Sequence, residues 1–141
     1  MKLLIINGPN LNLLGIREPK IYGRQDYAAL VKFCESACQN VGVQCEVYQS
    51  NHEGAIVDKI QEAYGRFDGI VINPAAYTHT SVAIADALKA VALPAVEVHL
   101  TEPLEREDFR HISYTADACV TRFAGLGFDS YRKAIEYLAD K

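Results

Sequence analysis

The feature that most constrains the fold of this chain is an alternation of short apolar runs with longer segments whose apolar residues recur at helical spacing. Two runs, Leu3 to Ile6 and Gly69 to Ile72, are almost continuously apolar and end in turn residues, which is typical of strands buried on both faces. The remaining expected strands are Val43 to Tyr48, Ala95 to Leu100, and Cys119 to Phe123, which Arg122 interrupts. This alternation predicts an α/β fold, a five-stranded parallel sheet in the doubly wound order 2-1-3-4-5 with helices on both faces.

Each helical segment begins at a residue type that caps helices. The expected starts, in chain order, are Asp26, the capping box of Ser50 and Glu53, Thr80 or Ser81, and Asp129. Glu105 to Arg110 is expected to add one helical turn, and Gly125-Leu126-Gly127 a tight turn before the last helix. Because the 141 residues contain no linker or repeat, we expect a single catalytic domain over residues 1–141.

Charge and cysteine content exclude several classes of protein. The net charge of −4, without a long basic run, argues against nucleic acid as a partner. The N-terminal apolar run has about four residues, too few for a signal peptide or a membrane span. The four cysteines form no CxxC pair and match no zinc spacing, so we expect reduced thiols, no metal and, by default, a cytoplasmic protein.

Polar residues follow three of the expected strands at the same edge of the sheet. Asn10 follows the first strand, Asn73 follows the third, and His99 lies at the end of the fourth. Ligands of doubly wound sheets bind beyond the carboxyl ends of the strands, at the switch point between the first and third strands. The sequence therefore predicts a binding site at this edge.

The long segment after the first strand carries Tyr22 and Arg17, which together are a candidate base. A free tyrosine has a pKa near 10, so only about a thousandth of it is ionised at neutral pH. A drop of roughly 2 units beside the Arg17 cation would raise that fraction about a hundredfold. The alternative is that Tyr22 is a half-buried packing residue of the loop.

Glu97 and His99 alternate with valines, so they share one face of the fourth strand. A carboxylate that orients an imidazole makes a proton donor, although the same contact also occurs in buried structural histidines. The other candidates also have purely structural alternatives. His79 contacts a ligand or belongs to a capped loop, and Asp86 has the alternative of a solvated surface charge. Arg106 or Arg110 binds a carboxylate or forms a surface ion pair.

With these residues identified, the chain closely resembles the type II 3-dehydroquinate dehydratases over nearly its whole length. The matching blocks are Asn7-Gly8-Pro9-Asn10-Leu11-Asn12 through Arg17-Glu18-Pro19 to Tyr22-Gly23; Asn73 to Asp86; Glu97-Val98-His99 through Arg106-Glu107 and Phe109-Arg110; and Gln49 to Gly54. The resemblance implies a flavodoxin-like subunit, a dodecamer built as a tetramer of trimers, and neither metal nor organic cofactor. It also implies anti elimination of water from 3-dehydroquinate to 3-dehydroshikimate, in either the shikimate pathway of aromatic amino acid biosynthesis or quinate metabolism.

The resemblance further implies a role for each matched residue. Tyr22, as a tyrosinate whose pKa Arg17 lowers, takes a proton from C2. Asn10 helps to hold a water at the enolate oxygen, and His99, oriented by Glu97, protonates the departing hydroxyl. The residues implied in substrate binding are Asn73, His79 and Arg110 at the hydroxyls, the N–H groups of Leu100 and Thr101 at the carboxylate, and Asp86 reaching a neighbouring subunit's site.

Two departures from the family pattern affect this assignment. Glu102 brings negative charge next to the expected carboxylate cradle, and Pro103 removes a backbone donor, so substrate binding weakens unless Glu102 points outward. Arg122 and Thr121 replace the apolar and glycine residues usual near the last strand. The competing function is a non-catalytic or flavin- or nucleotide-binding module on the same fold. A Schiff base is not expected, since no lysine occupies a buried strand end.

Overall fold

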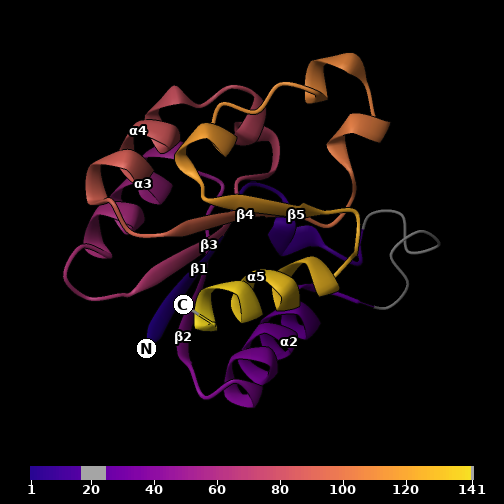
Figure 1. Cartoon of the computed structure of the whole chain (residues 1–141). Helices are drawn as coiled ribbons and strands as arrows, with labels where there is room; N and C mark the ends of the chain where they lie inside the picture. Colours follow the sequence, from indigo (N-terminus) through magenta and orange to yellow (C-terminus); the bar gives the residue numbers. More distant parts are fainter. Residues whose placement is uncertain (17–24, 141) are drawn as a thin grey trace.

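A computed structural model of the chain describes residues 1–16 and 25–140, so the predictions for Arg17 and Tyr22 lie outside the described residues. Five strands form one sheet in the order β2-β1-β3-β4-β5, and every neighbouring pair is parallel (Figure 1). The strands are β1 (Lys2–Asn7), β2 (Gln44–Gln49), β3 (Gly69–Asn73), β4 (Ala95–His99) and β5 (Thr121–Ala124). The predicted α/β class and strand order are confirmed.

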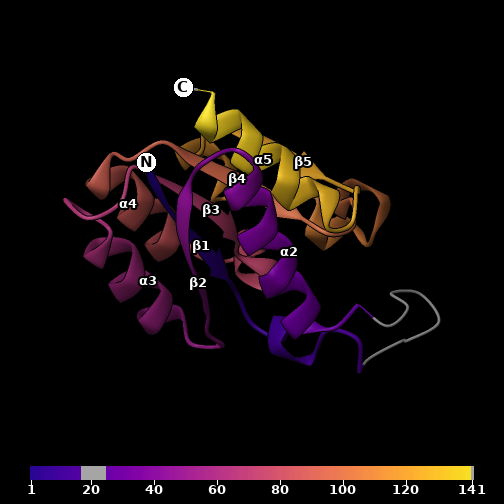
Figure 2. The ribbon, with the colours of Figure 1, turned by 90° about the horizontal axis from the view of Figure 1, so that it is seen from below.

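Within residues 1–16 and 25–140, four α-helices cover the sheet, two on each face (Figures 1 and 2). They are α2 (Tyr27–Asn40), α3 (Glu53–Glu62), α4 (Val82–Val91) and α5 (Asp129–Ala139). Leu3 and Ile5 of β1 pack with α2 and α5, whereas Leu4 and Ile6 pack with α3 and α4. Because both faces of β1 and β3 are covered, these strands are continuously apolar. No helix of the described ranges is long and apolar enough to cross a bilayer.

Two of the predicted helix caps are confirmed. The Asp26 carboxylate accepts a hydrogen bond from the N–H of Ala29 at 2.8 Å, and Ser81 Oγ accepts one from the N–H of Ile84 at 3.0 Å. Each bond satisfies one of the backbone donors that the first turn leaves without an intrahelical partner.

The other two predicted caps are wrong. Ser50 Oγ accepts from the N–H of His52 at 3.0 Å, and α3 begins after His52 without a side-chain cap. The serine bonds two residues ahead, as in a local turn, and is therefore not available to the N3 position of the helix. Asp129 is the first residue of α5, and its carboxylate accepts from Arg132 instead.

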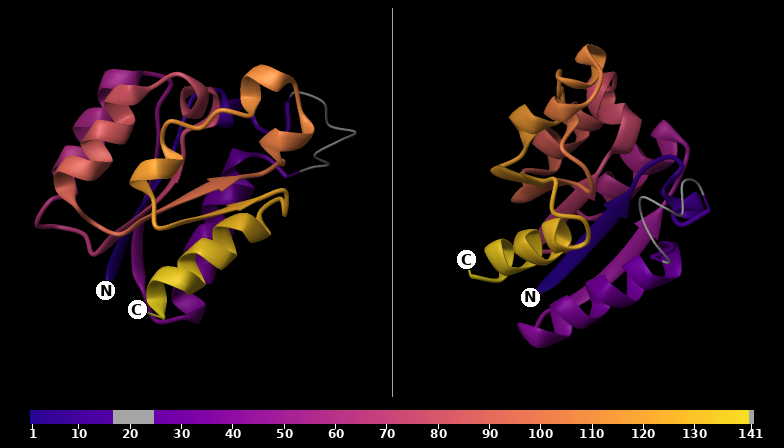
Figure 3. Two further views of the ribbon diagram at one scale, coloured as in Figure 1. Left: turned by 45° about the horizontal axis from the view of Figure 1, so that its top comes forward. Right: turned by 90° about the vertical axis from the view of Figure 1, so that its right-hand side faces the viewer.

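The connection from β4 to β5 is longer and less regular than predicted. The expected turn at residues 105–110 is two 3-10 turns, Pro103–Glu105 and Asp108–Arg110, and a third covers Ala116–Ala118. The first two lie beyond the carboxyl end of β4 (Figure 3, orange). The fifth strand begins at Thr121 rather than Cys119 and includes Arg122, which therefore does not interrupt it.

Candidate active site

A cavity of about 350 Å³ lies at the carboxyl ends of β1, β3 and β4, where the sequence predicted a site. Its polar and charged lining comes from the three segments that follow these strands. The lining includes Asn10, Asn73, His79, His99, Leu100, Thr101, Arg106 and Arg110. Seven of these eight residues were assigned to the site from the sequence, and the eighth, Arg106, was an alternative to Arg110 as a carboxylate grip.

A glycine and a buried tyrosine hold together the ends of β1 and β3, which lead into the segments that line this cavity. The N–H of Gly8 donates to Asn73 O at 2.8 Å, and a Cβ at Gly8 would lie only 2.5 Å from Pro74 O. Asn7 and Asn73 are register partners in β1 and β3, and Tyr131 OH of α5 bridges them. This hydroxyl donates to Asn7 Oδ1 at 2.6 Å and accepts from Asn73 Nδ2 at 2.9 Å.

Tyr131 is a functional neighbour that sequence reasoning missed. Helical periodicity identified it only as an inward-facing residue of the last helix. It is fully buried, and burial raises its pKa well above the ordinary value, so it stays a neutral hydrogen-bond donor. Because Asn73 Oδ1 also accepts from the N–H of Ala75 at 3.0 Å, the Asn73 side chain is held from both ends. One amide N–H remains for a ligand.

The segment after β2 holds the start of the loop that follows β1. The N–H of Asn10 donates to Asn51 Oδ1 at 3.0 Å, and Asn10 itself has a left-handed backbone with φ 71°. Gln49 Nε2 donates to Gly8 O at 3.2 Å and to Asn51 Oδ1 at 3.1 Å. Asparagine tolerates this backbone better than most residues. These bonds hold the backbone of Asn10, which lines the cavity, against the segment after β2.

His99 and Glu97 form the predicted pair. His99 Nε2 donates to Glu97 Oε2 at 2.9 Å; Glu97 has no exposed surface and His99 retains 7%. Burial by itself raises the pKa of Glu97, but hydrogen bonds from His99, Thr115 and Ser113 outweigh burial and hold that pKa below its ordinary value. A charged carboxylate thus fixes the ring that lines the cavity.

Ser113 and Thr115 were not predicted from the sequence as neighbours of the site. Thr115 Oγ1 donates to Glu97 Oε1, and Ser113 Oγ lies 3.2 Å from both carboxylate oxygens. They reach Glu97 because the β4–β5 connection folds back over the sheet. The only sequence signal is a pair of hydroxyl residues at positions i and i+2 in a polar loop.

His79 and Arg110 combine structural bonds with a place in the cavity wall. His79 Nδ1 donates to Ile112 O at 2.7 Å, since a carbonyl oxygen can only accept, and Nε2 is then the ring nitrogen left for a ligand. Arg110 Nε donates to Glu107, as the surface-pair alternative predicted, while the guanidinium also lines the cavity. The surface ion pair of Arg110 is therefore confirmed, and its contact with a ligand stays a prediction.

Leu100 and Thr101 lie where β4 ends, and both line the cavity. Their backbone N–H groups form no hydrogen bond within residues 1–16 and 25–140. Glu102 is not part of the cavity lining, and its carboxylate accepts from Arg122 Nη2 at 3.0 Å. The negative charge that the sequence placed beside the carboxylate cradle is therefore paired with a cation.

Asp86 does not join the other predicted residues. It is exposed on α4 and does not line the cavity of its own chain. In the part of the chain that the structure describes, no three His, Cys, Asp or Glu side chains form a group able to hold a metal ion.

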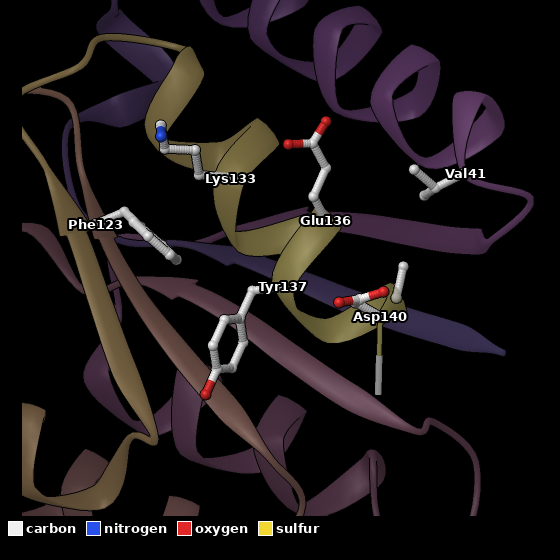
Figure 4. Close-up of a pocket in the computed structure, with 7 residues that line it drawn as sticks. Val41, Phe123, Lys133, Glu136, Tyr137 and Asp140 are labelled. Atoms are coloured by element: carbon white, nitrogen blue, oxygen red, sulfur yellow. The ribbon is translucent and has the colours of Figure 1, made fainter.

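A second hollow, of about 580 Å³, runs along α5 (Figure 4). Val41, Phe123 and Tyr137 give it an apolar side, and the charged residues Lys133, Glu136 and Asp140 line the rest. It shares no residue with the cavity at the strand ends, and no histidine or asparagine lines it. Among the described residues that line it, none corresponds to the His99 imidazole or to the Asn10 and Asn73 amides that make the first cavity a candidate for chemistry.

Comparisons with known proteins agree with this geometry. Residues 1–139 match the protein family described as dehydroquinase class II. A 3-dehydroquinate dehydratase of Lachnospira eligens is 53% identical over 142 residues, covering 99% of this chain and 97% of that protein. A catabolic 3-dehydroquinase 1 of Aspergillus terreus is 53% identical over 137 residues, covering 97% and 90%. The crystal structure of a type II dehydroquinase from Butyrivibrio crossotus superposes with a TM-score of 0.94 at 54% identity, covering 98% and 97% of the two chains.

Proposed function

The chain belongs to the class II dehydroquinase family, and from this premise we propose that it is a hydro-lyase that converts 3-dehydroquinate to 3-dehydroshikimate. The observation that carries the proposal is a histidine, oriented by a buried carboxylate, in the wall of a cavity rich in amide and cationic groups. Loss of water from a β-hydroxy ketone needs a base, support for the enolate oxygen, and an acid for the departing hydroxyl.

We assign the acid to His99. Since Nε2 already donates to Glu97, the proton that leaves is the one on Nδ1 of the imidazolium. The Glu97 carboxylate stabilises that imidazolium and keeps the ring in one orientation. The lowered pKa of Glu97 supports this role, because the carboxylate stays charged at neutral pH.

We assign the base to Tyr22, with Arg17 lowering its pKa; both assignments rest on the sequence alone. Asn10, which lines the cavity, would support the enolate oxygen through a water molecule. Deprotonation next to the ketone then leaves a charge that an amide-bound water stabilises before His99 completes the elimination.

Substrate binding is assigned to the other cavity residues. The N–H groups of Leu100 and Thr101 would bind the carboxylate, in the manner of other backbone anion sites. Asn73, His79 and Arg110 would contact the hydroxyl groups, each with a donor or acceptor left over from its structural bonds. The reaction as assigned uses no metal or organic cofactor.

We propose that the chain assembles into a homo-oligomer, a dodecamer built as a tetramer of trimers. Leu104, Phe109, Ile112 and Val120 of the β4–β5 connection are each more than half exposed, a surface that association would cover. Asp86 would then reach the site of a neighbouring subunit. Sedimentation should give the mass of twelve copies of the 15.6 kDa chain, and a monomer would refute the assembly. The single catalytic domain and the cytoplasmic location stay predictions from the sequence.

The direct test follows the ultraviolet absorbance of the conjugated product after 3-dehydroquinate is added. Tyr22→Phe should lower turnover by about a hundredfold or more with an unchanged circular dichroism spectrum. Tyr64→Phe is the matched control, because Tyr64 is 72% exposed and outside the cavity. Wild-type turnover in Tyr22→Phe would remove the proposed base, and trapping of substrate on a lysine by borohydride would replace the mechanism with a Schiff base.

The competing function is tested with the same preparation. A flavin-binding module would purify yellow and would leave 3-dehydroquinate unchanged. A colourless protein that produces the conjugated product excludes it.

A further inference from the structure

The parallel register of β4 and β5 places Arg122 directly beside Glu97. Since register partners in a sheet point to the same face, the guanidinium and the carboxylate share one side of the sheet. Arg122 Nε lies 3.9 Å from Glu97 Oε2, the same oxygen that accepts from His99 Nε2 at 2.9 Å. The imidazole and the guanidinium therefore meet at one carboxylate oxygen.

Arg122 is itself held in place by a second carboxylate. Its Nη2 donates to Glu102 Oε1 at 3.0 Å, so a single side chain links Glu102 to Glu97. The Arg122 side chain is 32% exposed and that of Glu102 22%, whereas Glu97 is fully buried. This partial burial distinguishes the chain of charges from an ordinary surface ion pair, which solvent screens.

We propose that Arg122 is a positioning residue for the His99–Glu97 pair, and that Glu102 anchors it there. The inference rests on the proposed function, because it concerns the residue to which that function assigns the acid. Arg122 does not line the cavity at the strand ends, so it acts through Glu97 rather than on the substrate.

The arrangement has two physical consequences. Thr115 donates to Glu97 Oε1, Ser113 lies 3.2 Å from both carboxylate oxygens, and Arg122 faces Oε2, so the carboxylate is held in one orientation toward His99. The carboxylate charge is also shared between two cations. An imidazolium that shares its counter-charge gives up its proton more readily than one that has the carboxylate to itself.

The other charged and titratable groups around the pair come from few elements. Arg110 and His111 line a small cavity of about 210 Å³ together with Glu97, His99 and Arg122. The Cys119 thiol also lies near the pair, and burial together with the negative charge of Glu97 raises its pKa to about 12. His79 shares the larger cavity with His99. From the helix side, the buried residues of α4 are all apolar, and β3 offers Ile72 in register with Glu97.

The test is the variant Arg122→Met, which keeps the length of the side chain and removes its charge. We expect kcat for 3-dehydroquinate to fall about tenfold with KM within about twofold. The alkaline limb of the kcat profile should move to higher pH, because the Glu97 carboxylate then faces the imidazolium without a second cation. Arg122→Lys, which restores a positive charge, should return the pH profile.

A readout without substrate separates this inference from the proposed function. In an NMR titration of the imidazole nitrogens, with His99 assigned from the spectrum of His99→Gln, the His99 midpoint should move to higher pH in Arg122→Met. If the wild type fails to convert 3-dehydroquinate, the proposed function fails, and the NMR shift still decides the role of Arg122. Glu102→Gln should produce part of the shift, and Glu102→Gln combined with Arg122→Met no more than Arg122→Met alone.

The matched control is Arg132→Met on α5. Arg132 also pairs with two carboxylates, at 3.1 Å and 3.3 Å, but its side chain is 41% exposed, and it lines neither the cavity at the strand ends nor the small cavity beside Glu97. Its removal should leave kcat, the pH profile and the His99 titration unchanged. An Arg122→Met protein that folds and matches wild type in all three would overturn the inference, as would a similar change in Arg132→Met.

Discussion

Gly8 is the position at which the structure makes its sharpest prediction about the candidate site. A Cβ built there would lie 2.5 Å from Pro74 O and 2.7 Å from Pro74 C, closer than real side chains approach backbone atoms. The obstacle cannot rotate away, because Pro74 O also accepts from the N–H of Tyr77 at 3.1 Å. Gly8→Ala therefore has to push the segments after β1 and β3 apart, and those segments carry Asn10 and Asn73.

The loss of stability in Gly8→Ala follows from the contacts that the new methyl group disrupts. Overpacking of this kind costs about 1–3 kcal/mol, and losing the 2.8 Å bond from Gly8 N–H to Asn73 O costs about 1 kcal/mol more. At an unfolding entropy of about 2.1 cal/mol/K per residue, a total of about 2–4 kcal/mol lowers the Tm of a 141-residue chain by about 7–14 °C. Because the displaced segments carry site residues, kcat for 3-dehydroquinate should also fall in the folded protein.

The assay is a thermal melt followed by circular dichroism, with all variants at one protein concentration, and activity measured well below Tm. Gly54→Ala is the matched control, since it makes the same chemical change in the first turn of α3, where a Cβ meets nothing within 4 Å. Alanine there should be neutral or slightly stabilising. A Gly8→Ala protein that melts with wild type, or a Gly54→Ala protein that loses as much, would refute the close-approach argument.

Three further predictions test buried polar groups. Tyr131→Phe leaves Asn7 Oδ1 and Asn73 Nδ2 without their shared hydroxyl, so the free energy of unfolding in guanidinium should fall by about 1–3 kcal/mol; an unchanged midpoint would contradict the bridge. Because the pKa of Glu97 is lowered in the fold, its stabilising contribution is present above the ordinary glutamate pKa and is lost as pH falls through the lowered value. Acid unfolding of Glu97→Gln should therefore be less steep than that of wild type, and parallel curves would count against the shift. Burial raises the pKa of Cys38 to about 12, so iodoacetamide at pH 8 should label it only after denaturation, as mass spectrometry would show; equal labelling of native protein would mean that the thiol is accessible.

The parts of the fold that the sequence predicted are those set by local patterns. Continuous apolar runs identified β1 and β3, and the caps at Asp26 and Ser81 gave correct helix starts, because each depends on residues within one turn. The wrong prediction of a cap at Ser50 also depended on residues within one turn. Its hydroxyl had two N–H groups within reach, and composition does not say which of them it bonds.

The contacts that the sequence could not predict join distant parts of the chain. Tyr131 reaches Asn7 across 124 positions, and Thr115 reaches Glu97 across a connection with no regular pattern. Helical periodicity places Tyr131 inside, but it cannot say that the hydroxyl lies between two asparagines. Such contacts depend on how strands pair and on where a helix docks, which are properties of the assembled sheet.

Glu102 and Arg122 are a second example of a contact between distant residues that the sequence could not predict. Taken separately, each adds a charge near the candidate site, and Glu102 alone would repel a carboxylate bound at Leu100 and Thr101. The register of β4 with β5 brings Arg122 alongside Glu97, within reach of the residue three positions beyond the end of β4. Each charge then offsets the other, and the guanidinium is left facing the carboxylate that orients His99. Two apparent defects in the sequence thus become one structural feature, because a parallel strand pairing, which neither residue reveals, sets the distance between them.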